Sequence, residues 1–214
     1  MNVSELLKQY GEGLREFNHV KLHAIELSGS DLSKISLVKA NLNCVNLAQA
    51  SLVEADLSEA LLLRVTLWRA DMRRTRLVSA RFDRSQLIRA NLSDAYGRGA
   101  SLRQADLRLG NLQNIDLMGA DLGGADLSYA DLSGANLVGA DLSYANLTGT
   151  NLSQADLTGA NLDHAIVVNS LWNGANLSGV DLSSLDVHRI DLSQASISKT
   201  VPNFSSASLS RFSR

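Results

Sequence analysis

A five-residue period governs this sequence. Counting in steps of five from Leu22 to position 197 gives 36 sites, of which 29 are Leu and only Gly97 is not apolar. Ala stands two residues before the site in 21 cases, and Asp or Asn lies between the two in 22. Such regular self-similarity is typical of repeat architectures and not of a conventional globular core.

A period of five suits neither an α-helix nor a flat strand. On a helix each step of five rotates by about 140°, so the Leu side chains would spread around the whole surface. Residues two apart share one face of a strand, but the next Ala follows each Leu after three residues, so the chain must turn between them. The pattern predicts coils of short extended segments and corners, with Ala and Leu inside and the other three positions outside. Stacked coils would share a continuous core.

A second spacing indicates the size of each coil. Gly recurs every twenty residues at five positions, which is expected where successive coils make the same tight corner. These positions are Gly99, Gly119, Gly139, Gly159 and Gly179. Each coil is therefore expected to hold four repeats.

The consensus A-(D/N)-L-x-x, as in Ala120-Asp121-Leu122-Gly123-Gly124, resembles that of the pentapeptide-repeat family. The resemblance implies an all-β fold, a right-handed quadrilateral parallel β-helix of about nine coils over residues 17–199. Residues 1–16 are predicted to form a short N-terminal capping helix, with Ser4 as its N-cap. Pro202 breaks the register, so residues 200–214 are expected to form a C-terminal cap and a frayed tail. Tyr96-Gly97 and Leu171-Trp172 are possible local bulges.

Composition excludes several classes of protein. The single Cys44 cannot form an intrachain disulfide, so a disulfide-stapled secreted scaffold is excluded. No signal peptide and no membrane-length apolar run is visible, which favours a cytoplasmic protein. The net charge of −2 gives no global reason to bind nucleic acid or a membrane. No dimerisation helix is evident, so a monomer is expected.

Catalytic chemistry finds little support in the sequence. No two of the four His share an outward column one or two coils apart, and no Ser–His–Asp arrangement is visible. The Asp of the repeat is interpreted as a turn-bonding or solvated residue. Neither a set of metal ligands nor a phosphate-binding loop is found. No enzyme activity, cofactor or metal is therefore expected.

Charge divides the chain into three parts. Residues 61–108 contain eleven Arg and four Asp, a net charge of +7, between an N-terminal part of −3 and a C-terminal part of −6. Arg favours forked contacts with carboxylates or phosphates. The alternative is that these Arg merely solubilise the outside of the rod.

Apolar residues turn outward within the same basic segment. Trp68 and Ile88 are twenty apart, so they should stack on adjacent coils. The same spacing holds for Arg64 with Arg84 and for Arg69 with Arg89. Trp surrounded by Arg is typical of a binding hot spot. The predicted partner-binding residues are Leu63, Arg64, Trp68, Arg69, Arg84, Ile88 and Arg89. A second outward apolar cluster contains Ile166, Val168 and Leu171.

The opening, including Met1-Asn2-Val3, Glu5 and Tyr10, resembles that of a cyanobacterial family member that acts by binding another regulatory protein. We therefore predict a non-enzymatic protein–protein interaction rod whose partner is a transcriptional or signalling regulator. The alternative is a DNA mimic that binds DNA gyrase or another DNA-handling protein. It rests on the acidic columns of the C-terminal half, such as Asp121, Asp141 and Asp181. Direct nucleic-acid binding is less favoured, because few aromatic residues accompany the Arg.

Overall fold

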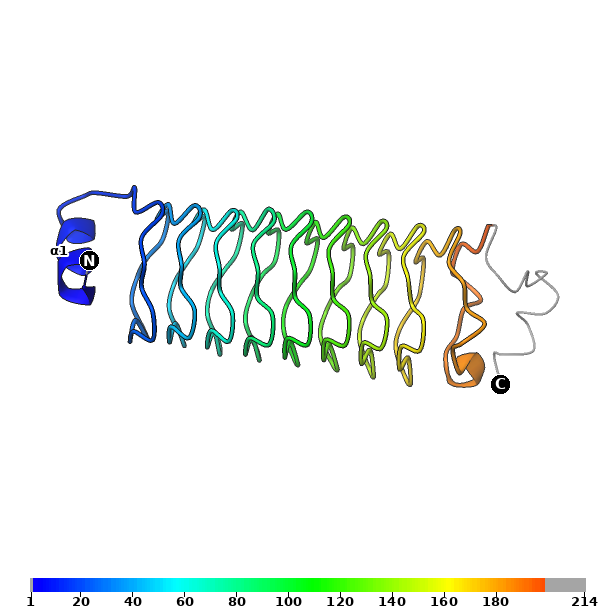
Figure 1. The fold of residues 1–214 in the computed structure, drawn as a ribbon. Coiled ribbons are helices and arrows are strands. Elements are labelled where there is room, and N and C mark those ends of the chain that lie inside the picture. The colour runs from blue at the N-terminus through cyan, green and yellow to red at the C-terminus, as the bar shows by residue number, and fades with distance from the viewer. Residues whose placement is uncertain (1, 199–214) are drawn as a thin grey trace.

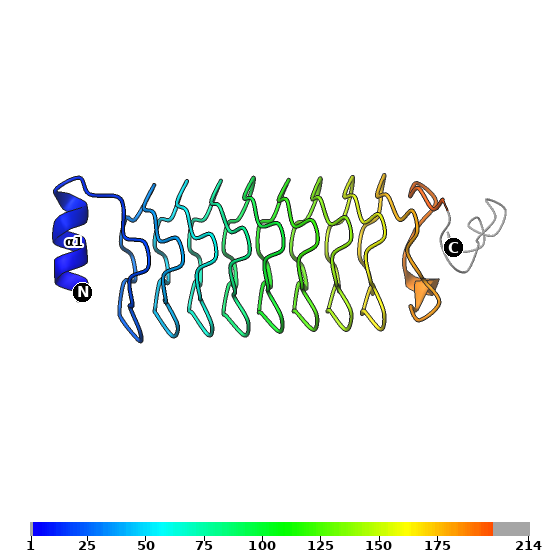
Figure 2. The ribbon, with the colours of Figure 1, turned by 45° about the horizontal axis from the view of Figure 1, so that its top comes forward.

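The computed structural model describes residues 2–198 as a helix followed by a rod of stacked coils. The helix α1 spans Val3–Gly11, and a short 3₁₀ helix, η1, spans Val187–Arg189 near the far end. The coils follow one another along a single axis, with α1 across one end of the stack (Figures 1 and 2).

Isolated parallel β-bridges join the coils. Every bridge connects residues twenty apart, from Glu16↔Ser36 to Asn176↔Ser196, and bridges recur every five residues along most of this span. Four bridging positions thus fall in each turn of the solenoid. This confirms the twenty-residue coil expected from the glycine spacing. Backbone hydrogen bonds run between coils, as from the Leu22 N–H to the Asn41 carbonyl at 2.8 Å.

The inward and outward positions are those that the period predicts. The Ala and Leu sites form one continuous buried cluster from Leu22 to Leu192. At four inward sites Thr or Ser replaces Ala and its hydroxyl donates to a backbone carbonyl: Thr75, Ser85, Thr150 and Ser170. Thr150 Oγ1 donates to the Leu127 carbonyl at 2.8 Å, and Ser85 Oγ donates to the Leu62 carbonyl at 2.6 Å. The core therefore accepts small polar side chains without leaving them unpaired.

Each repeat ends in a turn whose second outward residue has a positive φ. From His19 to Gly179 this angle lies between 52° and 75° at every such position. Gly adopts this conformation freely, whereas other residues do so at a cost. The five glycines that recur every twenty residues all have positive φ, as their spacing predicts. In the N-terminal half, most of these positions carry a long side chain despite the cost.

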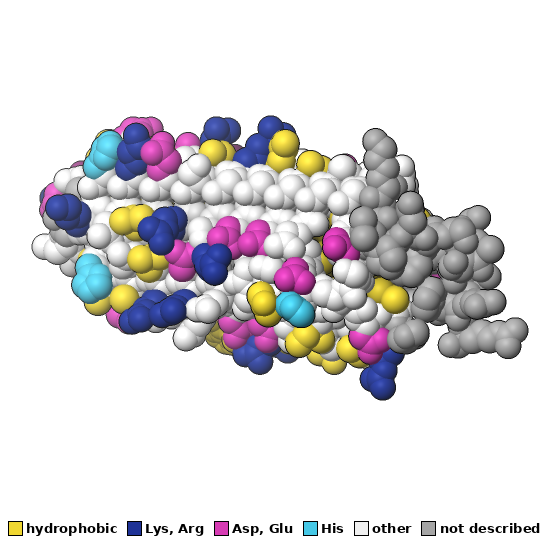
Figure 3. All heavy atoms as spheres, turned by 45° about the vertical axis from the view of Figure 1, so that its right-hand side comes forward, with side chains coloured by type: hydrophobic (Ala, Val, Ile, Leu, Met, Phe, Trp, Pro, Cys, Tyr) yellow, Lys and Arg dark blue, Asp and Glu magenta, His cyan; other side chains and the backbone are white. Residues whose placement is uncertain are grey.

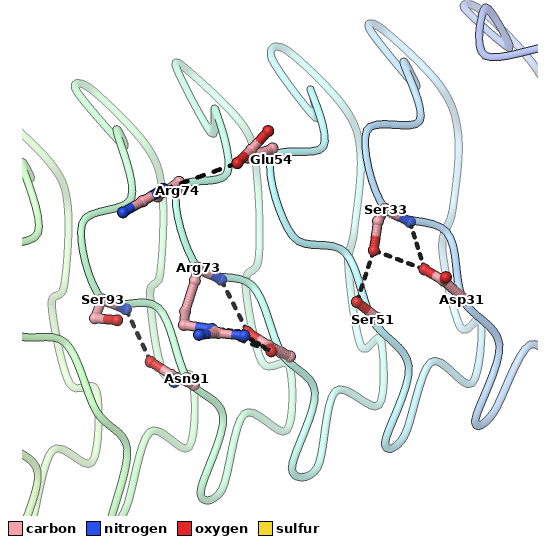
Figure 4. Close-up of polar contacts among 9 residues, drawn as sticks. Asp31, Ser33, Ser51, Glu54, Arg73, Arg74, Asn91 and Ser93 are labelled. Atoms are coloured by element: carbon pink, nitrogen blue, oxygen red, sulfur yellow. Dashed lines mark hydrogen bonds and ion pairs between the residues drawn. The ribbon is translucent and has the colours of Figure 1, made fainter.

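The Asp or Asn of the repeat stabilises the turn that follows it. Its Oδ1 accepts the backbone N–H of the residue two positions later (Figure 4). The distance is 3.0 Å from Asp31 to Ser33 and 3.1 Å from Asn91 to Ser93. Asp and Asn serve equally because both present this oxygen. The turn-bonding interpretation of these residues is confirmed.

Hydrogen bonds from neighbouring side chains to these carboxylates make stability depend on pH. The side-chain hydrogen bond from Arg73 lowers the pKa of Asp71 below its usual 3.8, and the Ser33 hydroxyl does the same for Asp31. A lowered pKa in the folded state adds stability above the unfolded pKa, and that stability is lost as the pH falls through the folded value. We expect the urea midpoint to be constant near pH 6 and to fall steadily below about pH 4.

Asp71→Asn is the matched variant for this measurement, because it keeps the Oδ1 acceptor but removes the titrating group. Its midpoint should fall less steeply with acid than that of the wild type. A wild-type midpoint that stays unchanged from pH 6 to pH 2.5 would contradict the assignment.

The helix α1 covers the open end of the first coil. Leu6 joins the core cluster, and the Tyr10 hydroxyl donates to the Ser33 carbonyl at 2.8 Å. The predicted N-cap, Ser4, is wrong. Asn2 is the N-cap: its backbone is extended and its side chain accepts the Glu5 N–H at 2.8 Å. Asn is as good an N-cap as Ser, so the helix begins two residues earlier than predicted.

No bulge is present at Tyr96-Gly97, whereas the pairing with the following coil shifts just after Leu171-Trp172: the Gly174 N–H donates to the Gln194 carbonyl, twenty residues away instead of the usual nineteen. The Gly97 N–H donates to the Asp116 carbonyl at 2.7 Å in the ordinary register, and the Leu117 side chain reaches into the space beside Gly97. Leu171 also keeps the register through its bridge to Asn151. The expected C-terminal cap and tail, with Pro202, lie outside the described residues.

Trp172 occupies an inward Leu site and is almost fully buried, with 1% of its surface exposed. Its indole N–H donates to Ser170 Oγ at 2.7 Å, and that hydroxyl donates to the Val167 carbonyl. Ser170 stands at the preceding inward site, where Ala is the consensus residue. The two departures from the consensus are thus physically coupled.

Ser170→Ala should therefore cost roughly 1–3 kcal/mol, because it leaves the buried indole N–H of Trp172 without an acceptor. The same change in a Trp172→Phe background should cost less, since no indole N–H remains. The free energy of urea unfolding of the four proteins measures this coupling. An equal cost in both backgrounds would exclude the coupling.

Candidate interaction surface

Four ridges run along the rod, each formed by the positive-φ residues of successive coils. We name two of these ridges after a glutamate that each contains. The Glu54 ridge contains Lys34, Glu54, Arg74 and Asp94, and the Glu59 ridge contains Lys39, Glu59 and Ser79. The other two take their names from arginines. The Arg64 ridge contains Cys44, Arg64, Arg84 and Gln104, and the Arg69 ridge contains Gln49, Arg69, Arg89 and Leu109.

Opposite charges alternate on the Glu54 and Glu59 ridges. Glu54 lies 3.7 Å from Lys34 and 3.9 Å from Arg74 of the coils on either side. Figure 4 shows Arg74 reaching across to Glu54. Lys39 and Glu59 form the same kind of pair at 3.5 Å. Lys34, Lys39 and Arg74 are thus paired with a glutamate of an adjoining coil.

Like charges stack on the other two ridges. The Arg64 N–H donates to the Asp83 carbonyl, and the Arg69 N–H donates to the Ile88 carbonyl. These bonds place Arg84 and Arg89 on the next coil. In the segment 61–108 seven other arginines are ion-paired: Arg73, Arg74, Arg76, Arg81, Arg98, Arg103 and Arg108. Arg64, Arg69, Arg84 and Arg89 form no ion pair with any residue from 2 to 198.

One face of the rod lies between these two ridges. Elsewhere the first turn residue folds back over the preceding face, as Arg73 Nε does toward Asp71 at 2.8 Å and Arg108 Nε toward Asp106 at 2.8 Å. By the same geometry, Trp68 and Ile88 lie on the face bounded by the Arg64 and Arg69 ridges. The four unpaired Arg therefore border the predicted apolar pair on both sides.

Trp68 is less exposed than its outward position suggests. It is half-buried, and the Arg69 guanidinium lies 4.8 Å from its ring centroid in a cation–π contact. The most exposed aromatic side chains among residues 2–198 are Tyr129 and Tyr144, each with 64% of its surface exposed. Trp68 therefore does not offer the largest exposed aromatic surface in this range.

Two hollows lie along these ridges. The larger, of about 590 Å³, contains three of the predicted residues, Leu63, Arg64 and Arg84. The sequence prediction missed its other lining residues: His23, Asn43, Cys44, Arg81, Asp83, Arg103 and Gln104. Most of them recur at twenty-residue steps on the turn columns of Leu63 and Arg64, so the spacing could have identified them. The smaller hollow, of about 410 Å³, is lined by Ile88, Arg89, Arg108, Leu109, Ser128 and Tyr129.

In the larger hollow, some arginines are ion-paired within the rod and others are not. Arg81 pairs with Asp83 at 2.8 Å, and Arg103 pairs with Asp121 at 2.9 Å. The hydrogen bond to Asp121 raises the pKa of Arg103. Arg84 Nε donates to Gln104 Oε1 at 2.9 Å, which orients its guanidinium without neutralising it. Arg64 and Arg84 thus remain as free cations beside Leu63.

The second apolar cluster does not form one patch. Ile166 and Leu171 are about half exposed, but they lie on neighbouring faces. Tyr144 and His164 of the Arg64 ridge stack with ring centroids 5.2 Å apart. Figure 3 shows basic side chains next to hydrophobic ones on the surface.

Within residues 2–198 no three His, Cys, Asp or Glu side chains are grouped to hold a metal ion. None of the helices in this range is long and apolar enough to span a membrane.

The acidic column on which the DNA-mimic alternative rests also stabilises turns of the rod. Oδ1 of Asp121, Asp141 and Asp181 accepts the N–H of the residue two positions later in each case, at 2.8–3.0 Å. Arg103 partly neutralises Asp121. Asp121, Asp141 and Asp181 therefore do not present the uniform negative charge of a nucleic-acid backbone.

Comparison with known proteins shows where the repeat belongs. The family of pentapeptide repeats (8 copies) matches residues 16–52, 40–77, 75–114, 115–154 and 155–194. The crystal structure of HetL is similar, with 34% identity and a TM-score of 0.78 over 94% of this chain and 92% of that one. HetL is a pentapeptide repeat protein involved in heterocyst differentiation regulation from the cyanobacterium Nostoc sp. strain PCC 7120.

Two other solved structures are more distant. QnrB1, a plasmid-mediated fluoroquinolone resistance protein, is 15% identical with a TM-score of 0.45, over 85% of this chain and 91% of that one. A pentapeptide repeat protein from the Arabidopsis thaliana thylakoid lumen is 31% identical with a TM-score of 0.37, over 65% and 90%. No curated protein matches this chain. The repeat matches and the likeness to HetL together show that the chain belongs to the pentapeptide-repeat family.

Proposed function

We propose that this protein is a non-enzymatic interaction rod that binds another protein in a regulatory role, as a HetL-like member of the family. In this proposal a right-handed, four-sided solenoid of about nine coils holds the binding residues at fixed spacing. The rod acts as a cytoplasmic monomer, and its partner is a transcriptional or signalling regulator. The working surface consists of Leu63, Arg64, Trp68, Arg69, Arg84, Ile88 and Arg89.

One observation carries the proposal. Two ridges stack Arg on Arg without a carboxylate, whereas on the other two ridges Glu54 and Glu59 pair with cations of adjoining coils. Stacked like charges repel, and each of these Arg also adopts a positive φ that costs conformational energy. A rod that needed only solubility would gain more from alternation. The arrangement is explained if an external partner supplies the missing negative charge.

The proposal is tested by affinity capture followed by direct binding. Tagged wild-type rod and the Trp68→Ala variant are used to capture proteins from the source organism. Each captured protein is identified, purified and titrated against both rods. A partner bound by the wild type and lost by Trp68→Ala supports the proposal. A partner that binds both equally, with the fold intact, contradicts the assigned surface.

A DNA mimic remains the second candidate, because Asp141 and Asp181 form no ion pair with any residue from 2 to 198. It predicts that a DNA-handling protein is captured through the acidic column. In that case binding should weaken steeply with added salt.

A further inference from the structure

We infer that the hollow lined by Leu63, Arg64 and Arg84 binds a short acidic peptide segment of the partner. This inference rests on the proposed function and adds the chemistry of what is bound. Carboxylate side chains of the segment would pair with Arg64 and Arg84, and an apolar side chain would lie against Leu63.

The two free guanidiniums set the charge of the occupant. Arg presents a planar fork of N–H groups that matches a carboxylate in a bidentate geometry. Arg84 is already oriented, because Gln104 Oε1 accepts its Nε–H at 2.9 Å and leaves the terminal nitrogens available. Arg64 stands one coil away, a step of about 4.8 Å. Alternate residues of an extended peptide are about 6.6 Å apart, a spacing that two flexible Arg heads can reach.

The surroundings favour a peptide over a nucleic acid. A DNA duplex carries one negative charge per about 1.7 Å and would meet like charges at this site. Asp83 lines the hollow itself, and Asp121 lies beside it as the partner of Arg103. A volume of about 590 Å³ has room for a few side chains, and Leu63 supplies an apolar wall. A segment with separated carboxylates and one apolar residue fits this mixture.

The lining offers a built-in reporter. Cys44 is the only cysteine of the chain, is exposed, and lines the same hollow. Its N–H donates to the Leu63 carbonyl at 3.0 Å, which places it on the coil next to Leu63. A bound segment should therefore slow alkylation of the Cys44 thiol.

The probe is the peptide fluorescein-Gly-Glu-Asp-Leu-Glu-Asp-Gly-amide, and its control carries the same label with Gln and Asn in place of Glu and Asp. Fluorescence anisotropy measures affinity for the full chain. We expect the acidic peptide to bind at least tenfold more tightly than the neutral one. At saturation it should slow reaction of Cys44 with iodoacetamide by at least threefold, while the neutral peptide has no effect.

The decisive variant is Arg64→Gln with Arg84→Gln. Gln already occupies the equivalent turn position at Gln49, Gln104 and Gln154, so the fold should be retained. Affinity should fall at least tenfold. The matched control, Arg74→Gln with Arg76→Gln, removes the same charge from arginines that are already paired with Glu54 and Asp56. It should leave the affinity within twofold of the wild type.

Four results would overturn the inference. The first is equal binding of the acidic and neutral peptides, and the second is equal loss of affinity in the two double variants. The third is tighter binding of single-stranded oligothymidine than of the acidic peptide. The fourth is dimerisation of the rod in sedimentation that Arg64→Gln with Arg84→Gln abolishes, because the occupant would then be a second copy. Capture of a Trp68-dependent partner alongside any of these results would leave the proposed function standing.

Discussion

Leu127→Asp should abolish stable folding of the rod. Leu127 is fully buried, and its side chain lies in an apolar column between Leu107 and Leu147 of the adjoining coils. A carboxylate there would have no partner, and an unpaired buried charge costs several kcal/mol even after it is neutralised by a shifted pKa. Roughly 5–15 kcal/mol is the whole stability of a typical domain. Each coil contacts only its neighbours, so one defective coil also separates the two halves of the stack.

Asn169→Asp is the matched control, since it introduces the same side chain at an exposed ridge position with φ 58°. Asp tolerates this conformation about as well as Asn. Ser128, although outward in the repeat, is unsuitable as a control because only 7% of its surface is exposed and its N–H donates to Asp126. Urea unfolding followed by circular dichroism gives the midpoints. Similar midpoints for Leu127→Asp and Asn169→Asp would show the assignment of inward and outward positions to be wrong.

Trp68→Ala and Arg84→Ala should each weaken binding of the captured partner by about 2 kcal/mol or more, which is about 30-fold. Trp68 contributes a half-buried ring already held under Arg69, so little side-chain entropy is lost when a partner covers it. Arg84 contributes an oriented, unpaired guanidinium. Both residues point away from the core, so the unfolding midpoint should stay close to that of the wild type.

The triple variant Asp121→Asn, Asp141→Asn and Asp181→Asn is the matched comparison. It keeps the Oδ1 acceptors of the turns and removes three negative charges. Isothermal titration against the same partner should show a change of less than threefold. If the triple variant abolishes binding while Trp68→Ala leaves it intact, the acidic column is the working face and the DNA-mimic function becomes the better account.

Much of this architecture is already specified by the repeat. The inward sites, the twenty-residue coil and the turn role of Asp and Asn all follow from short-range rules. A residue's place in the period decides which way it points, and the turn bond spans only two residues. The stacking of Arg64 with Arg84, and of Arg69 with Arg89, follows from the same counting because the bridges of this segment all join residues twenty apart.

What repeat position does not decide is how side chains pair across coils. Arg64, Arg69 and Arg74 all occupy the second turn position, yet Arg74 pairs with Glu54 of the preceding coil, Arg69 covers Trp68, and Arg64 forms no ion pair with any residue from 2 to 198. The prediction of Ser4 as the N-cap of α1 was wrong because Asn2, an equally good N-cap, lies two residues before it. A long, flexible side chain can pair with neighbours on several coils and faces. Which neighbour it pairs with depends on distances that exist only once the coils are stacked. The hollow beside Leu63 therefore belongs to the tertiary structure.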